Sequence, residues 1–331
     1  MRRREFIALL TGAAVGSPLA AFAQRGERVR RIGVLIPFSQ SDPETQALLA
    51  AFLQRIKELG WTDGGNAHFE YRYSDGNPER TRTAAAELVG LSPDVILAYA
   101  NPAVSSLMQV TQSTPIVFTQ ASDPVGSGFV PSLAHPGGNI TGFHSFEPAI
   151  AGKWLEVLKE LAPGVRRAAI VHHPNIAANV AFVRAGEAAS SMFGVTITSA
   201  AVRNAKDKDI EETITKFAQE PSGGLVVAPA PPTFDNRELV VALAARFRLP
   251  AVYCYRFFVT SGGLVSYGID GKDLWREAAV YVDRILRGAK PGDLPVQLPT
   301  KYRLVINLKT AKDLGIDVPT QFQQRADEII E

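Results

Sequence analysis

Short apolar runs alternate along this chain with longer segments in which apolar residues recur every three or four positions. Unbroken apolar runs are typical of strands buried on both faces of a parallel sheet, and the spaced pattern is typical of amphipathic helices. In the first half the strands are expected at 29–37, 67–73, 94–98 and 115–118, and the helices at 43–60, from 77 onward and at 101–112. This β-α-β-α-β-α-β order predicts a doubly wound parallel sheet.

The second half repeats the pattern of the first. The segment 29–37 is echoed by 165–174, 95–100 by 225–230, and 115–118 by 250–253. The three matches keep their order and lie 130 to 136 residues apart. Two similar α/β lobes, each of about 100 residues, are therefore expected. Chance likeness among valine-rich strands is the alternative.

Further elements are expected in the second half from the same two patterns. Helices are expected at 149–161, 177–193, 207–219, 236–247, 270–286 and 309–314, and strands at 195–202, 263–268 and 302–307. The fold class is thus α/β, with two doubly wound parallel-sheet lobes.

The segment from Thr119 to Phe143 separates the two halves. It holds five glycines and three prolines in 25 residues, which argues against a long helix or a central strand. We therefore expect a crossover that ends the first lobe and makes the first passage into the second, with its start at 119–123 facing a ligand. A plain surface connection, with glycines that only serve turns, is the alternative.

The expected domains follow from the repeat and from this crossover. They are a signal peptide at 1–23, an N-terminal lobe at 24–143 completed by segments from 263–331, a C-terminal lobe at 144–262, and crossover strands and helices shared between the lobes at 263–331.

Residues 1–23 have the pattern of an export signal. Three arginines precede an apolar run that ends in Ala21-Phe22-Ala23, the small-x-small form that a signal peptidase accepts. The pair Arg3-Arg4 is also similar to a twin-arginine signal. Cleavage before Gln24 and a periplasmic location are expected. Because the residue after the cleavage point is Gln24 and not cysteine, a lipid anchor is not expected.

Composition and charge narrow the class of protein. Hydrophobic residues make up 46% of the chain and charged residues 21%, as in soluble globular proteins. Removing residues 1–23 changes the formal charge from +2 to 0, so no nucleic acid partner is expected. The single cysteine, Cys254, cannot form an intramolecular disulfide, and its apolar setting indicates a small buried side chain rather than a catalytic thiol.

Motifs for cofactors, metals and nucleophilic catalysis are missing from the sequence. It contains neither a phosphate-binding G-x-x-x-x-G-K-[ST] loop nor a G-x-S-x-G, H-E-x-x-H or paired-cysteine pattern. His172 and His173 are neighbours on an expected strand, so they point to opposite faces and cannot share a metal. No cofactor, metal or catalytic residue is expected.

Candidate binding residues lie where the expected strands end. In open α/β sheets ligands bind beyond the carboxyl ends of the strands, and two lobes can present these ends to each other across a cleft. The expected ligand-binding residues are Ser39, Tyr99, Asn101, Thr119, Ser122, Asp123 and Phe143 from the first half, and His173, Asn175, Pro229, Tyr253 and Tyr255 from the second. These hydroxyls, amides and aromatic rings suit a small organic solute with an apolar or aromatic body.

Several of these residues have a structural alternative. Asp123 precedes a proline and either forms a turn or binds an ammonium group. Asn101 also precedes a proline and favours the N-cap of a helix. Tyr253 and Tyr255 share a strand face, and core packing is the alternative for at least one of them.

Longer motifs connect the chain with a known family. They are RRREFIALL, RIGVL, DPVGSGFVPSLAHPGGNITGF, GGLVSYG, KPGDLPVQLPTKYRLVINLKTAKDLGI and the closing RADEIIE. With these motifs the chain resembles the periplasmic substrate-binding proteins of ABC transporters, in particular the tryptophan/tyrosine-type group. The resemblance implies a type I periplasmic-binding fold, whose lobes close on a solute about a hinge, and a membrane permease as partner.

Three functions were weighed. The favoured one is a monomeric receptor for a small organic solute, an amino acid or aromatic carboxylate, that closes on it in the cleft between its lobes. An exported α/β enzyme that acts on a small metabolite in the same cleft is the alternative. A transcriptional regulator with this fold would need a helix-turn-helix segment, and the chain begins with an export signal instead.

Overall fold

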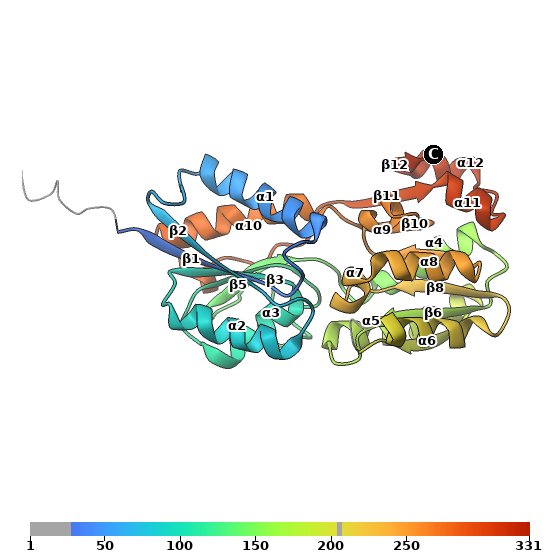
Figure 1. The fold of residues 1–331 in the computed structure, drawn as a ribbon, viewed down its shortest axis with the longest axis horizontal. Coiled ribbons are helices and arrows are strands. Elements are labelled where there is room, and N and C mark those ends of the chain that lie inside the picture. The colour runs from blue at the N-terminus through green and yellow to red at the C-terminus, as the bar shows by residue number, and fades with distance from the viewer. Residues whose placement is uncertain (1–27, 204–206) are drawn as a thin grey trace, which may run out of the picture.

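The computed structural model describes residues 28–203 and 207–331. Two α/β lobes lie side by side, and the chain crosses between them more than once (Figure 1). The expected signal peptide at 1–23 lies outside the described residues. Within the described ranges, no helix combines the length and apolar character that a membrane span requires.

The first lobe is built on a parallel sheet with the order β2-β1-β3-β4-β5. Its strands are β1 (Arg30–Ile36), β2 (Ala67–Tyr73), β3 (Val95–Tyr99), β4 (Ile116–Ala121) and β5 (Ile140–His144). Its helices are α1 (Pro43–Glu58), α2 (Pro78–Gly90) and α3 (Ala100–Val110). Figure 1 shows α2 and α3 on one face of the sheet, and α1 beside α10 (Gly271–Leu286) on the other.

Local capping fixes where the first two helices begin. The Asp42 carboxylate accepts a hydrogen bond of 2.7 Å from the Thr45 N–H, and the Asn77 side chain accepts from the N–H of Glu79 and of Arg80. These contacts satisfy N–H groups that have no partner inside the helix. The predicted starts of both helices are confirmed.

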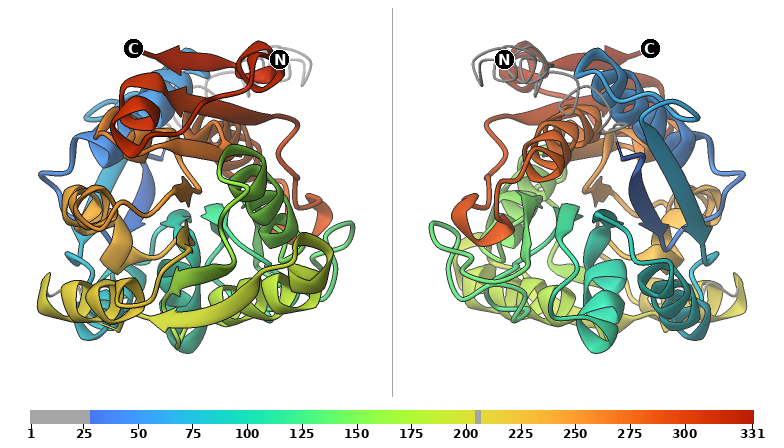
Figure 2. Two further views of the ribbon diagram at one scale, coloured as in Figure 1. Left: turned by 90° about the vertical axis from the view of Figure 1, so that its right-hand side faces the viewer. Right: turned by 90° about the vertical axis from the view of Figure 1, so that its left-hand side faces the viewer.

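The second lobe has a larger sheet with the order β12-β11-β10-β9-β8-β6-β7, in which β11 runs antiparallel to β10. Its strands are β6 (Arg167–His172), β7 (Thr196–Ala201), β8 (Gly223–Val227), β9 (Ala251–Tyr253), β10 (Val265–Ile269), β11 (Tyr302–Asn307) and β12 (Glu328–Ile330). Its helices are α4 (Ile150–Leu161), α5 (Ala177–Phe193), α6 (Asp207–Ala218), α7 (Pro231–Asp235), α8 (Arg237–Arg246), α9 (Arg256–Thr260), α11 (Leu308–Leu314) and α12 (Thr320–Arg325). The end views in Figure 2 show helices covering both faces of the sheets.

The internal repeat is visible in the strand order. The first sheet reads β2-β1-β3-β4-β5, and part of the second reads β7-β6-β8-β9-β10. The strands that match in sequence, β1 with β6, β3 with β8 and β4 with β9, occupy equivalent places in the two orders. The predicted α/β class with two doubly wound lobes is confirmed, with the antiparallel strand β11 as an addition.

The prediction of an unbroken crossover from Thr119 to Phe143 was wrong at both ends. Residues 119–121 belong to β4, and 140–143 belong to β5, an edge strand of the first sheet. The passage into the second lobe follows at 145–149. Glycine was taken as a sign against a strand, but Gly142 is what lets β5 approach β4. A Cβ atom at Gly142, where φ is +154°, would lie 2.1 Å from the Phe118 carbonyl oxygen.

Short elements also escaped the sequence prediction. The helices α7, α9 and α12 span five or six residues, and β12 spans three. Such elements are too short to show a hydrophobic period. Two of them, α7 and α9, follow the strands β8 and β9 and so stand at the carboxyl edge of the second sheet.

Helix α10 ties the two halves of the chain together. It comes from the second half, yet it packs on the first lobe against α1, β3, β4 and β5. Its Trp275 is fully buried, with ring centroids 5.1 Å from Tyr99 and 6.4 Å from Phe52. The first lobe is therefore complete only after residue 286.

Three connections join the lobes, at 145–149, at Asp270 and at 294–301. The connections at 145–149 and 294–301 lie side by side. The Gln297 N–H donates to the Gly142 carbonyl over 3.0 Å, and the Gln297 carbonyl accepts from His144 N–H over 2.9 Å. The Tyr302 hydroxyl donates to the Ser145 carbonyl over 3.3 Å. These hydrogen bonds form a strip beside β5 about which the lobes can turn, and we call it the hinge strip.

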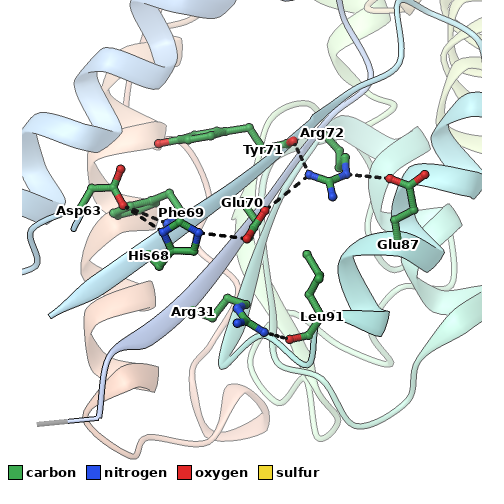
Figure 3. A network of polar contacts seen from close by, with 9 residues as sticks. All are labelled: Arg31, Asp63, His68, Phe69, Glu70, Tyr71, Arg72, Glu87 and Leu91. Atoms are coloured by element: carbon green, nitrogen blue, oxygen red, sulfur yellow. Dashed lines mark hydrogen bonds and ion pairs between the residues drawn. The ribbon is translucent and has the colours of Figure 1, made fainter. Parts of the chain in front are cut away.

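The opposite edge of the first sheet is the exposed strand β2, which carries a network of charged side chains (Figure 3). The His68 Nε2 atom lies 3.1 Å from the Glu70 carboxylate, and the Arg72 Nε atom donates to Glu87 over 2.8 Å. Charged side chains on an edge strand hinder pairing with another chain. The network is therefore suited to protecting the open edge of the sheet.

The close approach at Gly142 yields a stability prediction. A Gly142→Ala variant should lose about 1–3 kcal/mol in free energy of unfolding, because the new methyl group meets the backbone of β4. Urea denaturation measures this loss. Gly138→Ala is the matched control, since a Cβ atom there meets nothing within 4 Å. Equal stability of the two variants would contradict the account of β5.

Candidate functional site

The two lobes touch across the cleft between the carboxyl edges of their sheets. The rings of Phe38, after β1, and Phe234, in α7, stack with centroids 4.9 Å apart and planes 29° apart. Arg237 of α8 donates to the carboxylate of Asp42 over 2.6 Å, and these side chains are only 18% and 12% exposed. The structure is therefore a closed form, in which both contacts join one lobe to the other.

A narrow cavity of about 20 Å³ lies at the centre of the closed cleft, and we call it the neck. Phe38 and Tyr99 line it from the first lobe, with ring centroids 4.8 Å apart, and Phe234 and Tyr255 line it from the second, 5.1 Å apart. The remaining lining residues are Ala100, Asn101, Pro102, Gln120, Ser122, Ile176, Pro229, Ala230 and Pro231. The neck is thus bounded by aromatic rings from both lobes.

A larger cavity of about 320 Å³, the α3-side recess, adjoins the neck on the side of α2 and α3. It shares Asn101 and Ile176 with the neck, and its polar lining consists mainly of hydroxyls and amides. Its charged residue is Arg82, already paired with Glu79. Its volume is near the lower end of the range for small-molecule sites, about 300–1,000 Å³.

A second cavity of about 320 Å³, the α10-side recess, adjoins the neck on the side of α1 and α10. It shares Tyr99, Gln120 and Tyr255 with the neck. Its charged lining residues are Glu44, Arg256, Asp270, Lys272 and Arg303. The cleft therefore consists of two recesses joined by an aromatic neck, with the more strongly charged recess next to α10.

Most of the residues predicted from the sequence meet in this cleft. Those that line the neck or a recess are Tyr99, Asn101, Ser122, His173, Asn175, Pro229 and Tyr255. Ser39 lines a shallow cavity of about 410 Å³ at the mouth, together with Asp42 and Arg237. The other four, Thr119, Asp123, Phe143 and Tyr253, do not line these cavities.

The N-cap prediction for Asn101 was wrong. The N-cap position of α3 is Tyr99, and Asn101 lies inside the first turn, 8% exposed. Its amide nitrogen donates to the Ser122 carbonyl over 2.8 Å, and its amide oxygen accepts from the Ser122 N–H over 2.8 Å. Asn101 therefore holds the end of β4 against the start of α3, in the wall of the cleft.

The four residues outside the cavities have structural contacts. The Asp123 carboxylate accepts from the Gly126 N–H over 3.0 Å, as its turn alternative predicted. Phe143 packs on Tyr281 with ring centroids 4.7 Å apart. Tyr253 is buried and stacks on Phe258, as expected for core packing. Thr119 is fully buried behind the cleft.

Residues that the sequence analysis missed also line the cleft. They include Phe38, Glu44, Phe234 and Lys272. Phe38 stands at the end of a predicted strand, so an inspection of every side chain at that end finds it. Gln120 also lines the cleft, and it lies in the segment 119–123 that was expected to face a ligand. Phe234 lies in an unpredicted helix, and Lys272 reaches the cleft only because α10 returns to the first lobe.

Burial shifts the pKa of several groups in the cleft toward the neutral form. It raises the pKa of the hydroxyls of Tyr99 and Tyr255 well above the ordinary value, and it lowers the pKa of His173. Burial also raises the pKa of Glu44, opposed by the Lys272 ammonium. The Cys254 thiol is fully buried and its pKa is raised, so it is inert as a nucleophile. Among the described residues, no group of His, Cys, Asp and Glu is arranged to hold a metal.

Comparisons with known proteins agree on one family. A family model described as ABC transporter substrate binding protein matches residues 31–330. A tyrosine-binding protein of Clostridioides difficile (strain R20291) is 24% identical over 278 residues, which cover 83% of this chain and 78% of that protein.

Solved structures give the same result. A conserved domain protein from Vibrio cholerae has a TM-score of 0.85 and 28% identity, covering 91% of this chain and all of that one. An ABC domain from Streptococcus pneumonia in complex with L-Trp has a TM-score of 0.84 and 26% identity, covering 91% of this chain and 99% of that one.

The hinge beside the cleft generates a pH prediction. His144 ends β5, is 1% exposed, and neither ring nitrogen has a hydrogen-bond partner among the described residues. Burial lowers its pKa from 6.5 to about 4, so the folded protein excludes a proton that the unfolded chain binds. As the pH falls from about 6.5 to 4, His144 should therefore remove up to about 3 kcal/mol from the free energy of unfolding.

Urea denaturation at pH 7 and pH 4.5 tests this prediction with a His144→Leu variant. The variant should lose less stability on acidification than the wild type. His135→Leu is the control, because His135 is exposed and its loss should leave the acid sensitivity unchanged. The same acid sensitivity in wild type and His144→Leu would contradict the role of His144.

Proposed function

Because this chain belongs to the family of ABC transporter substrate-binding proteins, we propose that it captures an aromatic amino acid between its two lobes. As a member of this family it is a solute receptor that works with an ABC permease. The proposed solute class rests on the neck, whose aromatic side chains come from both lobes. The relatives named as tyrosine-binding and solved with L-Trp support the same class.

The stacked pair of Phe38 and Phe234 is the observation that carries the proposal. These rings lie in different lobes and touch at the centre of the cleft. A solute whose ring reaches this pair would gain an apolar and stacking contact from each lobe. Such a solute binds best where both lobes reach it.

Closure is the second part of the proposal. A ligand drives closure only if it binds the closed form better than the open form. Contacts from both lobes to one ring meet this requirement. The ion pair between Asp42 and Arg237 would then hold the mouth shut, since its side chains are largely withdrawn from water.

The proposal also covers the location, the oligomeric state and the lobe boundaries of the protein. We propose a monomer in the periplasm, exported by a signal peptide at 1–23, without nucleic acid partners and without enzymatic activity. We also propose lobe boundaries at 24–143 and 144–262, with 263–331 shared between the lobes. The contacts of α10 with the first lobe support the shared segment. Ser39, Thr119, Asp123, Phe143 and Tyr253, which lie outside the neck and its two recesses, are proposed to act on the solute only through the residues they support.

Binding of L-tryptophan and L-tyrosine tests the function. Either ligand at 100 times its Kd should stabilise the mature protein by about 2.7 kcal/mol, measured as a shift in melting temperature.

A Phe38→Ala variant should bind roughly thirtyfold more weakly in calorimetry, because an aromatic contact at the centre of an interface contributes about 2 kcal/mol or more.

The control for this experiment is Phe193→Ala, at the end of α5 and outside the cleft, which should keep the wild-type affinity. Binding of neither amino acid by the wild type would refute the proposed solute class. Chemical conversion of a bound solute would instead support the enzyme alternative.

A further inference from the structure

Two polar side chains line the α10-side recess without making a hydrogen bond to a described residue. Gln120 is 4% exposed and Ser266 is 1% exposed, and both line this recess. Among the described residues, neither the amide of Gln120 nor the hydroxyl of Ser266 has a hydrogen-bond partner. Side-chain amides and hydroxyls that face a cavity with free hydrogen-bonding capacity are available to a polar ligand.

The chain leaves room for Gln120 in particular. A Cβ atom at Gly271, the first residue of α10, would lie 2.2 Å from the Gln120 Nε2 atom. Gln120 itself has a φ of +54°, which few residues other than glycine adopt. A strained backbone and a glycine opposite it together direct the amide into the recess.

Two charged groups of opposite sign stand at the same recess without an ion-pair partner. Of the basic residues there, Arg256 is paired with Glu328, and Arg303 with Asp270. No ion pair within 4 Å involves Lys272 or Glu44 in the part of the chain that the structure describes. Lys272 and Glu44 nevertheless influence each other electrostatically.

The α3-side recess lacks such a pair. Acidic residues are absent from its lining as far as the structure describes it, and its one guanidinium, Arg82, is paired with Glu79. An ammonium group placed there would have no carboxylate to meet. The two recesses therefore differ in the ligand groups they can satisfy.

We propose that the α10-side recess binds the zwitterionic head group of the solute. Glu44 binds the ammonium, and Lys272 with the Gln120 amide binds the carboxylate, while the ring of the solute points toward the neck. This inference rests on the proposed function, and it adds the orientation of the solute and the residues that distinguish an amino acid from its acid or amine analogues. Ser266 offers a further hydrogen bond to the carboxylate.

Calorimetry with three ligands and two variants tests the assignment. The ligands are L-tyrosine, tyramine, which lacks the carboxylate, and 3-(4-hydroxyphenyl)propionate, which lacks the ammonium. Glu44→Gln should weaken L-tyrosine about tenfold or more but leave the affinity for the propionate unchanged. Lys272→Gln should weaken L-tyrosine by a similar factor and leave tyramine unchanged.

The matched control is Arg82→Gln, which removes one charge from the α3-side recess and should weaken no ligand selectively. Wild-type binding of L-tyrosine with no selective loss in Glu44→Gln and Lys272→Gln would overturn the head-group assignment alone. A selective loss in Arg82→Gln would place the head group in the other recess. Failure of the wild type to bind any aromatic amino acid would overturn the proposed solute class as well.

Discussion

The contact between the lobes, made by Phe38 on Phe234 and by Asp42 with Arg237, is the interaction on which the rest of this structure depends. Each pair has one member in each lobe, so neither exists unless the cleft is closed. Removing apolar rings and an ion pair from water stabilises the closed form only where the contacts are well matched. A solute that contacts both lobes in the cleft shifts this balance toward closure.

The two-lobed fold places the residues of the cleft mainly through the ordinary geometry of parallel strands. Parallel strands deliver their following loops to one edge, so the ends of β1, β3 and β4 face the ends of β6, β8 and β9 across the cleft. Helix α10 crosses back to the first lobe and brings Lys272 to the recess that Glu44 and Gln120 line. The hinge strip beside β5 leaves the opposite side of the cleft as its mouth.

The sequence predicted the two lobes and many of the cleft residues, but it missed Phe38 and Phe234 at the centre of the cleft. Buried parallel strands and amphipathic helices have hydrophobic periods that can be read directly, which is why the internal repeat and the alternation of strands and helices were predicted. Strand β5 was missed because Gly142 was taken as a breaker, whereas it permits close approach to Phe118. Phe234 reaches the cleft only through the short helix α7. Lys272 reaches it only through α10, which returns to the first lobe. Asn101 looked like a cap, but the folded chain uses its amide to fasten Ser122.

A distance across the cleft tests closure by solute most directly. Spin labels on Glu79→Cys in α2 and Arg184→Cys in α5 report on different lobes, and the native Cys254 is fully buried and stays unlabelled. Pulsed electron paramagnetic resonance should show a longer or broader distance distribution without solute and a single shorter distance with saturating L-tyrosine. Adding Arg237→Gln should shift the solute-free population further toward the long distance. An unchanged distribution in a protein that demonstrably binds L-tyrosine would contradict the account.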